Sequence, residues 1–350
     1  MQTYRAVIVG LTGIGARRPS EPTGLPLYGA VPGSHAAAYH RHPQTEVVGV
    51  CDIRQEALDG FQKDWRDIWP DMHYYTDYKE MLDVEKPDLV SVATPDHIHA
   101  NITIDAANGG AQAILCEKPI ATTLDDVDRM IAATEANNIL LSIEHTRRWR
   151  SRYHSARELI RSGELGKLRT VTANMFSNRS MLFRNGTHTV DMICFFAESD
   201  PQWVFAELEE GFDHFTEYLS DGGHDPATDP AASAYIHFAD GVRGFYNSVK
   251  VPFPGTQMEL VCEDGLIEIS DIEAAVIRGT DHWSRSRTAI VADDYLYAEQ
   301  LGAVAELVHI LEQGGELVSP AREARKTVEI MLAMLKSHEL GNVRVNLPMK

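Results

Sequence analysis

"ILCEKPIATTLDDVDRMI", residues 114–131, joins an apolar run to a helical pattern through an acid, a lysine and a proline. The run stops at Cys116 and Pro119 prevents further strand pairing. Thr123 is placed to cap the helix, with Asp126 three residues on. Glu117 and Lys118 therefore lie where a predicted strand ends. Ligands bind parallel sheets at that edge, so the pair is a candidate functional site.

Similar apolar runs alternate with helical patterns over the first 145 residues. Continuous apolar strands separated by helices predict a parallel sheet that is covered on both faces. The expected fold class is thus α/β, beginning with a Rossmann dinucleotide-binding domain over residues 1–145, and functional residues should follow each strand. The predicted strands cover residues 6–9, 47–51, 89–93, 113–116 and 139–142.

The first run leads into the glycine-rich turn "VGLTGIGARR", residues 9–18. Glycines at such a turn let the backbone approach a pyrophosphate. The usual spacing requires glycine where Thr12 stands, so a tight turn without a ligand is the alternative. The residues of the turn expected to bind a cofactor are Gly10, Thr12, Gly13, Ile14 and Gly15.

Asp52 follows the second run. An acid at this position accepts hydrogen bonds from ribose hydroxyls and favours NAD, whereas Arg54 could face the 2′-phosphate of NADP. A helix cap is the alternative role for Asp52. After the third run, "ATPDHIHA" at 93–100 supplies four further cofactor-binding candidates, Thr94, Pro95, His97 and His99.

The glycine turn and Asp52 are farther apart than usual. The expected gap is about 20 residues, and here it is about twice that. The excess is rich in proline and glycine, and Ser34 after it is a plausible helix cap. We predict an inserted loop over residues 17–33. Arg17 and Arg18 either neutralise the pyrophosphate or belong to a loop that covers the site or lies on the surface.

Composition limits the class of protein. The 350 residues are 44% hydrophobic and 24% charged, with a formal net charge of -19, which argues against a nucleic-acid partner. We expect no membrane span and no signal peptide. Cys51 and Cys116 end apolar runs, which predicts buried free thiols in a reducing cytoplasm. The four cysteines of the chain are scattered, without a C-x-x-C pair. They are Cys51, Cys116, Cys194 and Cys262.

The pattern changes after residue 145, where several strands alternate polar and apolar residues. This predicts an α+β domain over residues 146–350 with an open, mostly antiparallel sheet. "ADG" at 239–241 predicts a hairpin turn. The expected strands cover 167–176, 202–209, 232–239, 242–250, 257–262 and 265–270, and the expected helices cover 155–162, 298–312 and 321–340.

The segment "RNGTHTVDMICFF", residues 184–196, contains the second group of candidates. His188 and Asp191 are three residues apart and share one face of a helix. Histidine titrates near neutrality when unperturbed, so His188 is suited to accept a proton. A capping or core histidine is the alternative.

Taken together, these motifs resemble the glucose–fructose oxidoreductase, inositol dehydrogenase and MocA (Gfo/Idh/MocA) family. The matching segments are the glycine turn, "SHAAAY", Asp52, "ATPDHIHA", "EKP" at 117–119, "SGELGKLR", "GTHTVD" and "SHELGNVRVNLP". Most members are NAD- or NADP-dependent dehydrogenases of sugars, cyclitols or related polyols. The resemblance implies a substrate and oligomerisation domain after the Rossmann domain, and a homodimer or homotetramer formed through its sheet.

The resemblance also implies roles for individual residues. Lys118 would lie beside the nicotinamide and stabilise the alkoxide, and Glu117 would contact the nicotinamide side or form a structural salt bridge. His188 would be the general base, oriented by Asp191. Many relatives have an aspartate where Arg184 stands, which suggests an anionic substrate such as a sugar acid, or else a surface charge.

Further candidates for substrate binding lie beside Arg184 and at the domain junction. Asn185 follows Arg184, while Arg147, Arg148 and Trp149 fall at the domain junction, where relatives often have a basic–aromatic pair. Asn185, Arg148 and Trp149 are therefore expected to bind substrate. Packing of the junction explains the junction residues equally well.

The predicted function is an NAD(P)-dependent dehydrogenase of a carbohydrate or polyol, with no metal, nucleic acid or membrane partner. Two rivals lie within the resemblance, a redox-neutral NAD-dependent glycosidase and a non-catalytic nucleotide-binding sensor. A third is a metal-dependent hydrolase or isomerase, which would use ligands from His97, His99, His145, His188 and Asp191. Their spacing matches no metal signature.

Overall fold

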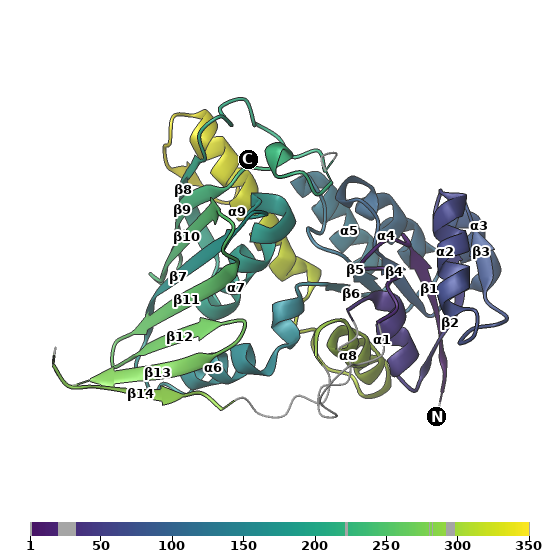
Figure 1. Cartoon of the computed structure of the whole chain (residues 1–350), viewed down its shortest axis with the longest axis horizontal. Helices are drawn as coiled ribbons and strands as arrows, with labels where there is room; N and C mark the ends of the chain where they lie inside the picture. Colours follow the sequence, from purple (N-terminus) through teal and green to yellow (C-terminus); the bar gives the residue numbers. More distant parts are fainter. Residues whose placement is uncertain are drawn as a thin grey trace. The chain divides into compact units, whose positions relative to one another are not determined.

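The computed structural model describes residues 2–19, 33–220, 223–279, 281, 283–291 and 298–349. The chain divides into two compact units (Figure 1). Unit 1 is Met1–Trp149 with Leu296–Arg322, and unit 2 is Arg150–Tyr295 with Glu323–Lys350. This differs from the expected division at residue 145, because the segment from Leu296 to Arg322 belongs to unit 1.

Unit 1 contains a six-stranded parallel sheet in the order β3-β2-β1-β4-β5-β6. This is the strand order of a dinucleotide-binding fold, with the order reversing between β1 and β4. All residues of β4 and β5 are buried, as expected for central strands covered on both faces. The strands are β1 (Tyr4–Val9), β2 (Thr45–Cys51), β3 (His73–Tyr75), β4 (Leu89–Val92), β5 (Ala113–Cys116) and β6 (Leu140–Ile143).

Helices α1, α2 and α8 share one hydrophobic core with the sheet. Apolar residues of α8 pack in this core beside Trp149, which explains why the late segment belongs to unit 1. The helices of the unit are α1 (His35–Arg41), α2 (Gln55–Trp65), α3 (Tyr78–Glu85), η1 (Asp96–Ile98), α4 (His99–Asn108), α5 (Leu124–Ala136), η2 (Thr146–Trp149) and α8 (Glu299–Gln313).

The predicted insertion interrupts the helix that follows the glycine turn. Arg17 N–H donates to Gly13, while His35 N–H donates to the carbonyl of Ile14 and Ala36 N–H to that of Gly15. Helix α1 therefore continues the helical turn begun before the insertion. Residues 20–32 lie outside the described residues, and so does any role of that part of the loop.

Unit 2 contains a nine-stranded sheet in the order β14-β13-β12-β11-β7-β10-β9-β8-β15. All pairs are antiparallel except β7 with β10, which confirms the expected mostly antiparallel sheet. The strands are β7 (Leu168–Ser177), β8 (Pro201–Leu208), β9 (Ala232–Phe238), β10 (Arg243–Lys250), β11 (Gly255–Cys262), β12 (Leu266–Ser270), β13 (Ala274–Gly279), β14 (Arg285–Ala289) and β15 (Val345–Asn346).

Helix α7 packs against β7 and β10 and is buried along nearly all its length. It directly follows the π-helical turn η3, so both are placed by the same packing. The helical elements of unit 2 are α6 (Ser151–Arg161), η3 (Leu182–Gly186), α7 (Thr187–Ala197), η4 (Pro226–Thr228) and most of α9 (Ala321–Glu339).

Most expected elements are confirmed with small shifts of their ends, but four strands were missed. β3 and β15 are too short to form a recognisable run, and every residue of β14 is exposed, so no apolar face marks it. The fourth is β13. The hairpin at 239–241 is confirmed, since Gly241 has a φ of 88° and its N–H donates to Phe238.

Two expectations about composition concern the whole chain. All four cysteines are buried free thiols, which confirms the expectation for Cys51 and Cys116. Within the described ranges, no helix has the combination of length and apolar character that crossing a membrane requires.

Candidate functional site

The glycine turn allows β1 and β4 to approach closely. Gly10 has a φ of 96°, and a Cβ atom there would lie 2.4 Å from the carbonyl oxygen of Ala93. A Cβ on Gly15 would lie 2.1 Å from the carbonyl oxygen of Gly10. No larger residue fits at either position without moving backbone. Thr12 and Gly13, between them, are exposed. The turn therefore presents bare backbone at the carboxyl edge of the sheet, where a pyrophosphate binds in such folds.

Asp52 ties the second strand end to this turn. Its Oδ2 accepts the N–H of Leu11 at 3.0 Å, and its Oδ1 accepts the N–H of Arg54 at 3.0 Å. The Arg54 guanidinium also contacts both carboxylate oxygens, at 3.2 and 3.3 Å. Burial acts to raise the pKa of Asp52, but the Arg54 hydrogen bonds and the two backbone N–H groups outweigh it and lower that pKa. Asp52 is thus an ionised acceptor.

His99 holds two turns together rather than facing outward. Its side chain is fully buried, with Nε2 2.9 Å from the carbonyl of Thr94 and Nδ1 3.1 Å from that of Pro119. Two carbonyl acceptors require both ring nitrogens to carry protons, and the pKa of His99 is raised to about 10: burial opposes the shift, and Cys116, Asp96 and the Thr94 carbonyl outweigh it. His99 therefore joins the turn after β4 to the turn after β5, and the cofactor contact expected for it stays a prediction.

The other residues of the third strand end differ from His99. His97 and Pro95 are exposed. The Oγ1 atom of Thr94 is buried and has no hydrogen-bond partner among the described residues. A buried hydroxyl of this kind is suited to bond a ligand at the sheet edge.

Glu117 is the end of a buried hydrogen-bonded chain. Tyr39 Oη and His35 Nδ1 both lie 2.8 Å from Ser91 Oγ, and His35 Nε2 lies 3.2 Å from Glu117 Oε1. The other Glu117 oxygen accepts the backbone N–H of Lys118 at 3.2 Å. Burial acts to raise the pKa of Glu117, but His35 and Lys118 outweigh it and lower that pKa.

This series of hydrogen bonds orients the turn after β5, which carries Lys118. The Lys118 side chain is only partly buried. His35 was not predicted as a site residue, although its place just after the Ser34 cap offered a signal. Its contact with Glu117 joins positions 82 residues apart, which no local pattern records.

His188 and Asp191 lie on α7 of unit 2, one helical turn apart as predicted. Asp191 is fully buried, and the Thr327 hydroxyl donates to its Oδ1 at 3.4 Å. His188 is partly exposed. Of the two, His188 is therefore the better placed to meet a ligand, and Asp191 sits beneath it in the protein interior.

Arg184 and Asn185 lie on the turn η3, which is held by an acid that the sequence reasoning missed. The Asp229 carboxylate accepts the N–H of Phe183 at 3.1 and 3.2 Å and that of Arg184 at 2.9 Å. Burial raises the pKa of Asp229 to about 6, against the opposing effect of these backbone bonds. The Oδ1 atom of Asn185 is buried without a hydrogen-bond partner in the described structure.

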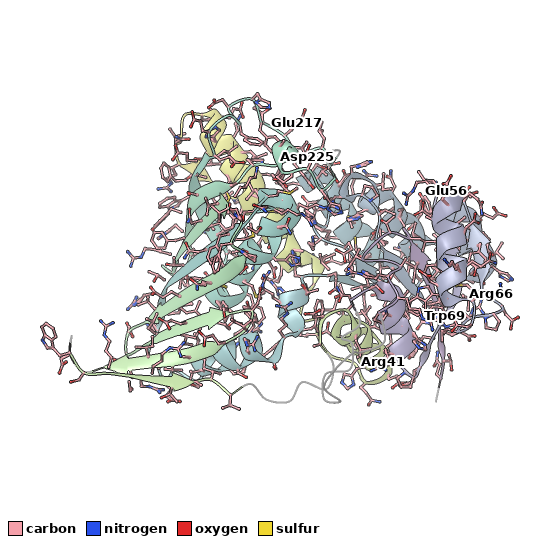
Figure 2. All side chains as sticks on the ribbon, in the orientation of Figure 1. Arg41, Glu56, Arg66, Trp69, Glu217 and Asp225 are labelled. Atoms are coloured by element: carbon pink, nitrogen blue, oxygen red, sulfur yellow. The ribbon has the colours of Figure 1, made fainter. Side chains whose placement is uncertain are left out.

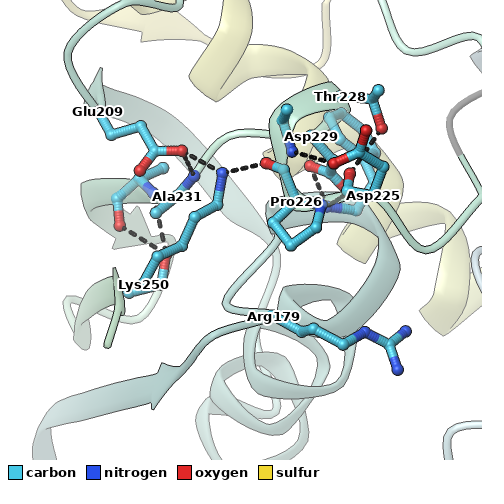
Figure 3. Close-up of polar contacts among 12 residues, drawn as sticks. Arg179, Glu209, Asp225, Pro226, Thr228, Asp229, Ala231 and Lys250 are labelled. Carbon is cyan, nitrogen blue, oxygen red and sulfur yellow. Dashed lines mark hydrogen bonds and ion pairs between the residues drawn. The ribbon is translucent and has the colours of Figure 1, made fainter. Parts of the chain in front are cut away.

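Asp229 belongs to the segment between β8 and β9, which Figure 2 labels at Glu217 and Asp225. Lys250 anchors that segment by bonding the Glu209 carboxylate and the Pro226 carbonyl (Figure 3). A cavity of about 160 Å³ beside Asp229 is lined mainly by residues 214–220. The segment thus links a small cavity to the turn that carries Arg184. Its stretch "DGGHDPATDP", residues 221–230, has a composition typical of a mobile loop, and residues 221–222 of it lie outside the described residues.

Two expected substrate-binding residues belong to the interior of unit 1. Trp149 is 1% exposed and packs against Gly302 of α8, while Arg148 is 3% exposed and its Nη1 donates to the Val318 carbonyl at 2.8 Å. These contacts lie within unit 1, and the substrate contacts expected of Arg148 and Trp149 stay predictions. Arg18, considered for the pyrophosphate, pairs at 2.6 Å with Asp67, an exposed residue just after the end of α2.

The structure therefore assembles the expected residues in two groups. Unit 1 brings the glycine turn, Asp52, Thr94, Glu117 and Lys118 to the strand ends of one sheet, and unit 2 holds His188 near Arg184 and Asn185. Across the described residues, no three His, Cys, Asp or Glu side chains are arranged to hold a metal ion.

Comparison with protein families covers both units. Residues 28–145 match the model of an oxidoreductase family with an NAD-binding Rossmann fold, and residues 153–268 match a Gfo/Idh/MocA C-terminal domain. The chain belongs to the Gfo/Idh/MocA oxidoreductase family. The resemblance seen in the sequence and the expected NAD-binding fold are thereby confirmed.

Named relatives in this family include sugar and cyclitol dehydrogenases. The chain is 29% identical over 150 residues to an uncharacterized oxidoreductase of Schizosaccharomyces pombe, covering 41% of this chain and 40% of that protein. It is 32% identical over 127 residues to inositol 2-dehydrogenase of Salmonella typhimurium, covering 35% of each. It is 23% identical over 331 residues to D-apiose dehydrogenase of Paraburkholderia graminis, covering 88% of this chain and 85% of that one. The first two matches thus span less than half of either protein.

Solved structures of the family share the fold over the full length. An oxidoreductase domain protein from Kribbella flavida has a TM-score of 0.78 at 19% identity, and all of each chain is covered. The WlbA dehydrogenase from Bordetella pertussis, solved with NADH and UDP-GlcNAcA, has a TM-score of 0.72 at 17% identity, again with both chains fully covered. At these identities the likeness concerns the fold alone.

Proposed function

We propose that this Gfo/Idh/MocA protein is an NAD(P)-dependent dehydrogenase that oxidises an alcohol of a sugar, cyclitol, sugar acid or related polyol. The observation that carries the proposal is Lys118 at the end of β5, on a turn fixed by the buried Ser91–His35–Glu117 chain. A cation held at this edge of an NAD-binding sheet is suited to reactions that develop negative charge. The similarity to an inositol 2-dehydrogenase and a D-apiose dehydrogenase supports this choice of substrate class.

The residues of unit 1 fit a nicotinamide dinucleotide. The close approach at Gly10 and Gly15 leaves bare backbone for the pyrophosphate, and the unpartnered hydroxyl of Thr94 is available to the cofactor. When bound, NAD supplies the acceptor for a hydride. The chain's own residues then have to bind it, orient the substrate and handle the hydroxyl proton.

Asp52 and Arg54 decide between NAD and NADP in this proposal. Asp52 receives four hydrogen bonds, two of them from the Arg54 side chain, which is 54% exposed. Because a carboxylate accepts about four bonds, Arg54 must swing away before Asp52 can accept ribose hydroxyls. The released guanidinium would then face a 2′-phosphate. We therefore propose NAD as the preferred cofactor, with NADP tolerated through Arg54.

Lys118 and His188 divide the remaining work. Lys118 stabilises the alkoxide as hydride leaves carbon, and His188 takes the hydroxyl proton. Asp191, buried and bonded to Thr327, holds the helix face that carries His188. Arg184 and Asn185 contact the substrate, and the cation at Arg184 favours a substrate with a carboxylate.

A screen tests the proposal directly. Reduced nicotinamide absorbance is followed with NAD or NADP across sugars, cyclitols, sugar acids and nucleotide sugars. We expect turnover of at least one compound, faster with NAD than with NADP. Turnover of glycosides without net reduction would replace this proposal with a redox-neutral glycosidase. Nucleotide binding without turnover of any compound would indicate a sensor.

The role of Lys118 has its own prediction. Lys118→Ala should lower kcat by roughly 10²–10³-fold, because the alkoxide loses its cation, while the Kd for NAD changes little. Steady-state kinetics and fluorescence titration with NADH measure the two quantities. Lys63→Ala, which removes an exposed lysine of α2, is the matched control and should leave both unchanged. Equal kcat values for the two variants would refute the role of Lys118.

We also propose that unit 2 forms the contact between subunits in a homodimer or homotetramer. Phe205, Tyr235 and Phe245 stand in register across β8, β9 and β10. Tyr235 also stacks on Trp203 at 4.9 Å between ring centroids. A row of aromatic side chains on one sheet face, with Phe205 44% exposed, is suited to burial against a second copy.

A further inference from the structure

Glu144 is a buried acid that the proposed reaction does not yet use. It is the first residue after β6, and its N–H donates to the Cys116 carbonyl at 2.9 Å. Cys116 pairs with Ile143 in the parallel register, so Glu117 and Glu144 follow matched positions on neighbouring strands. Residues at matched positions of parallel strands point to the same face of the sheet. The two carboxyl groups are therefore neighbours.

The two acids differ in their partners. Glu144 is 1% exposed and Glu117 is 7% exposed. Glu117 is bonded by His35 and by the Lys118 N–H. Both carboxyl oxygens of Glu144 have no hydrogen-bond partner among the described residues. Burying an ionised carboxylate without a partner is far more costly than burying a neutral acid.

Most of the charges around Glu144 also favour its neutral form. The end of β5 contributes Glu117 and Lys118, α1 contributes His35 and Tyr39, α8 contributes Glu299 and Glu306, and His145 follows on its own segment. Burial, and then Glu117, Glu299 and Glu306, raise the pKa of Glu144 well above its usual range, and Lys118 only partly opposes them. For Glu117 the shift is downward. When the pKa values of two neighbouring acids are shifted in opposite directions, one acid stays protonated and the other is ionised.

We propose that Glu144 is a positioning residue of the hydride-transfer site, a neutral carboxylic acid whose retained proton leaves Glu117 as the single anion beside Lys118. If Glu144 ionised, two carboxylates would compete for the Lys118 ammonium group. The ammonium would then be neutralised from within the protein, and less of its charge would act on the substrate alkoxide. Glu144 thus acts through Lys118, without touching the substrate. This inference rests on the role proposed for Lys118.

The first test detects the proton retained by Glu144 without measuring activity. The free energy of unfolding by urea is measured for wild type and Glu144→Gln from pH 5 to pH 8. A raised pKa means that the folded state keeps a proton that the unfolded state has released, so wild type loses stability as pH rises. The folding equilibrium constant of wild type should fall about tenfold per pH unit relative to the glutamine variant, until the folded-state pKa is passed.

Glu85→Gln is the matched control. Glu85 is also a buried glutamate of unit 1, but His73, Tyr75 and Arg5 bond its carboxylate, and its pKa is lowered although burial opposes this. The difference in the free energy of unfolding between wild type and Glu85→Gln should not change from pH 5 to pH 8. A flat difference for Glu144→Gln as well would overturn the proposal.

The second test reads the effect on Lys118. Using a substrate found in the screen, kcat/KM is measured against pH for wild type and Glu144→Gln. Wild type should decline on the alkaline side as Glu144 ionises, and the variant should lose that decline. Suppose that the two kcat/KM profiles are identical while the difference in the free energy of unfolding still changes with pH. Glu144 would then hold a proton without positioning Lys118, and the proposal would be overturned. Full activity in Lys118→Ala would refute the proposed function instead, and the stability test would still report the Glu144 proton.

Discussion

At the scale of single residues, the glycine turn shows how a local requirement becomes a binding site. Gly10 and Gly15 are there because backbone carbonyls occupy the space that a side chain would need. The resulting tight turn leaves the backbone of Thr12 and Gly13 exposed at the sheet edge. The sequence indicated these positions despite Thr12, since the requirement for glycine is local.

Gly10→Ala tests this requirement. The Cβ atom would lie 2.4 Å from the Ala93 carbonyl oxygen and the backbone would keep a φ of 96°, so we expect a loss of roughly 2–4 kcal/mol in the free energy of unfolding. Urea unfolding measures it. Gly60→Ala is the control: it lies inside α2 with no atom within 4 Å of the added Cβ, and it should stabilise by about 1 kcal/mol. Similar effects from both changes would contradict the steric account.

Asp229 gives a second prediction at this scale, through its pKa of about 6. The folded state keeps the proton longer than the unfolded state, so this contribution to stability is full below about pH 4 and is lost as pH rises to 6. Asp229→Asn removes this loss of stability with rising pH, because asparagine does not titrate. Relative to the variant, wild type should lose on the order of 2–3 kcal/mol over that range in urea unfolding. Asp71→Asn, at an exposed position, is the control variant, and a flat result for Asp229→Asn would refute the assignment.

At the scale of elements, α1 shows how an insertion is tolerated. The helical turn at Gly13–Arg17 and helix α1 are separated along the chain, yet backbone bonds from His35 and Ala36 join them into one helix. Ser34 closes the join. Its Oγ accepts the N–H of Ala37 and donates to the carbonyl of Arg17 at 2.6 Å.

Ser34→Ala tests that join. It removes a helix cap and the bond to Arg17, so we expect a cost of about 1–2 kcal/mol in urea unfolding. Thr123→Ala is the comparison, because Thr123 caps α5 without joining two segments, and it should cost about 1 kcal/mol. If Ser34→Ala cost no more than Thr123→Ala, the bond across the insertion would contribute nothing.

At the scale of the whole molecule, the open sheet of unit 2 predicts self-association. In a homo-oligomer, a second copy of the protein would cover the aromatic row of Phe205, Tyr235 and Phe245. The formal charge of -19 makes unspecific association of the remaining surface unfavourable.

The double substitution Tyr235→Glu with Phe245→Glu should convert the oligomer to monomers, because it places unpaired charge in the contact. Light scattering after gel filtration gives the mass. Trp283→Glu, which changes a side chain that is 95% exposed, is the control and should leave the mass unchanged. A monomeric wild type, or an oligomer in the double variant, would refute the proposed interface.

The sequence by itself determined what depends on neighbouring residues. Buried runs marked five of the six parallel strands, glycines and prolines marked the turns, and the residue that follows a strand marked Asp52, Thr94 and Lys118 as candidates. The same rule missed Glu144, because the fifth run was predicted to end at residue 142, whereas β6 ends at Ile143. Sequence also placed His188 and Asp191 on one helix face.

Only the tertiary structure decided which of these residues are exposed and which are buried and hold the candidate site in place. His35 reaches Glu117 across 82 residues, Asp229 reaches Arg184 across 45, and α8 covers Trp149 from the far end of the chain. Hydrogen bonds and burial of this kind join distant parts of the chain, and no local pattern encodes them. The charge state of Glu144 has the same origin, since a carboxyl group changes its pKa only when folding removes it from water.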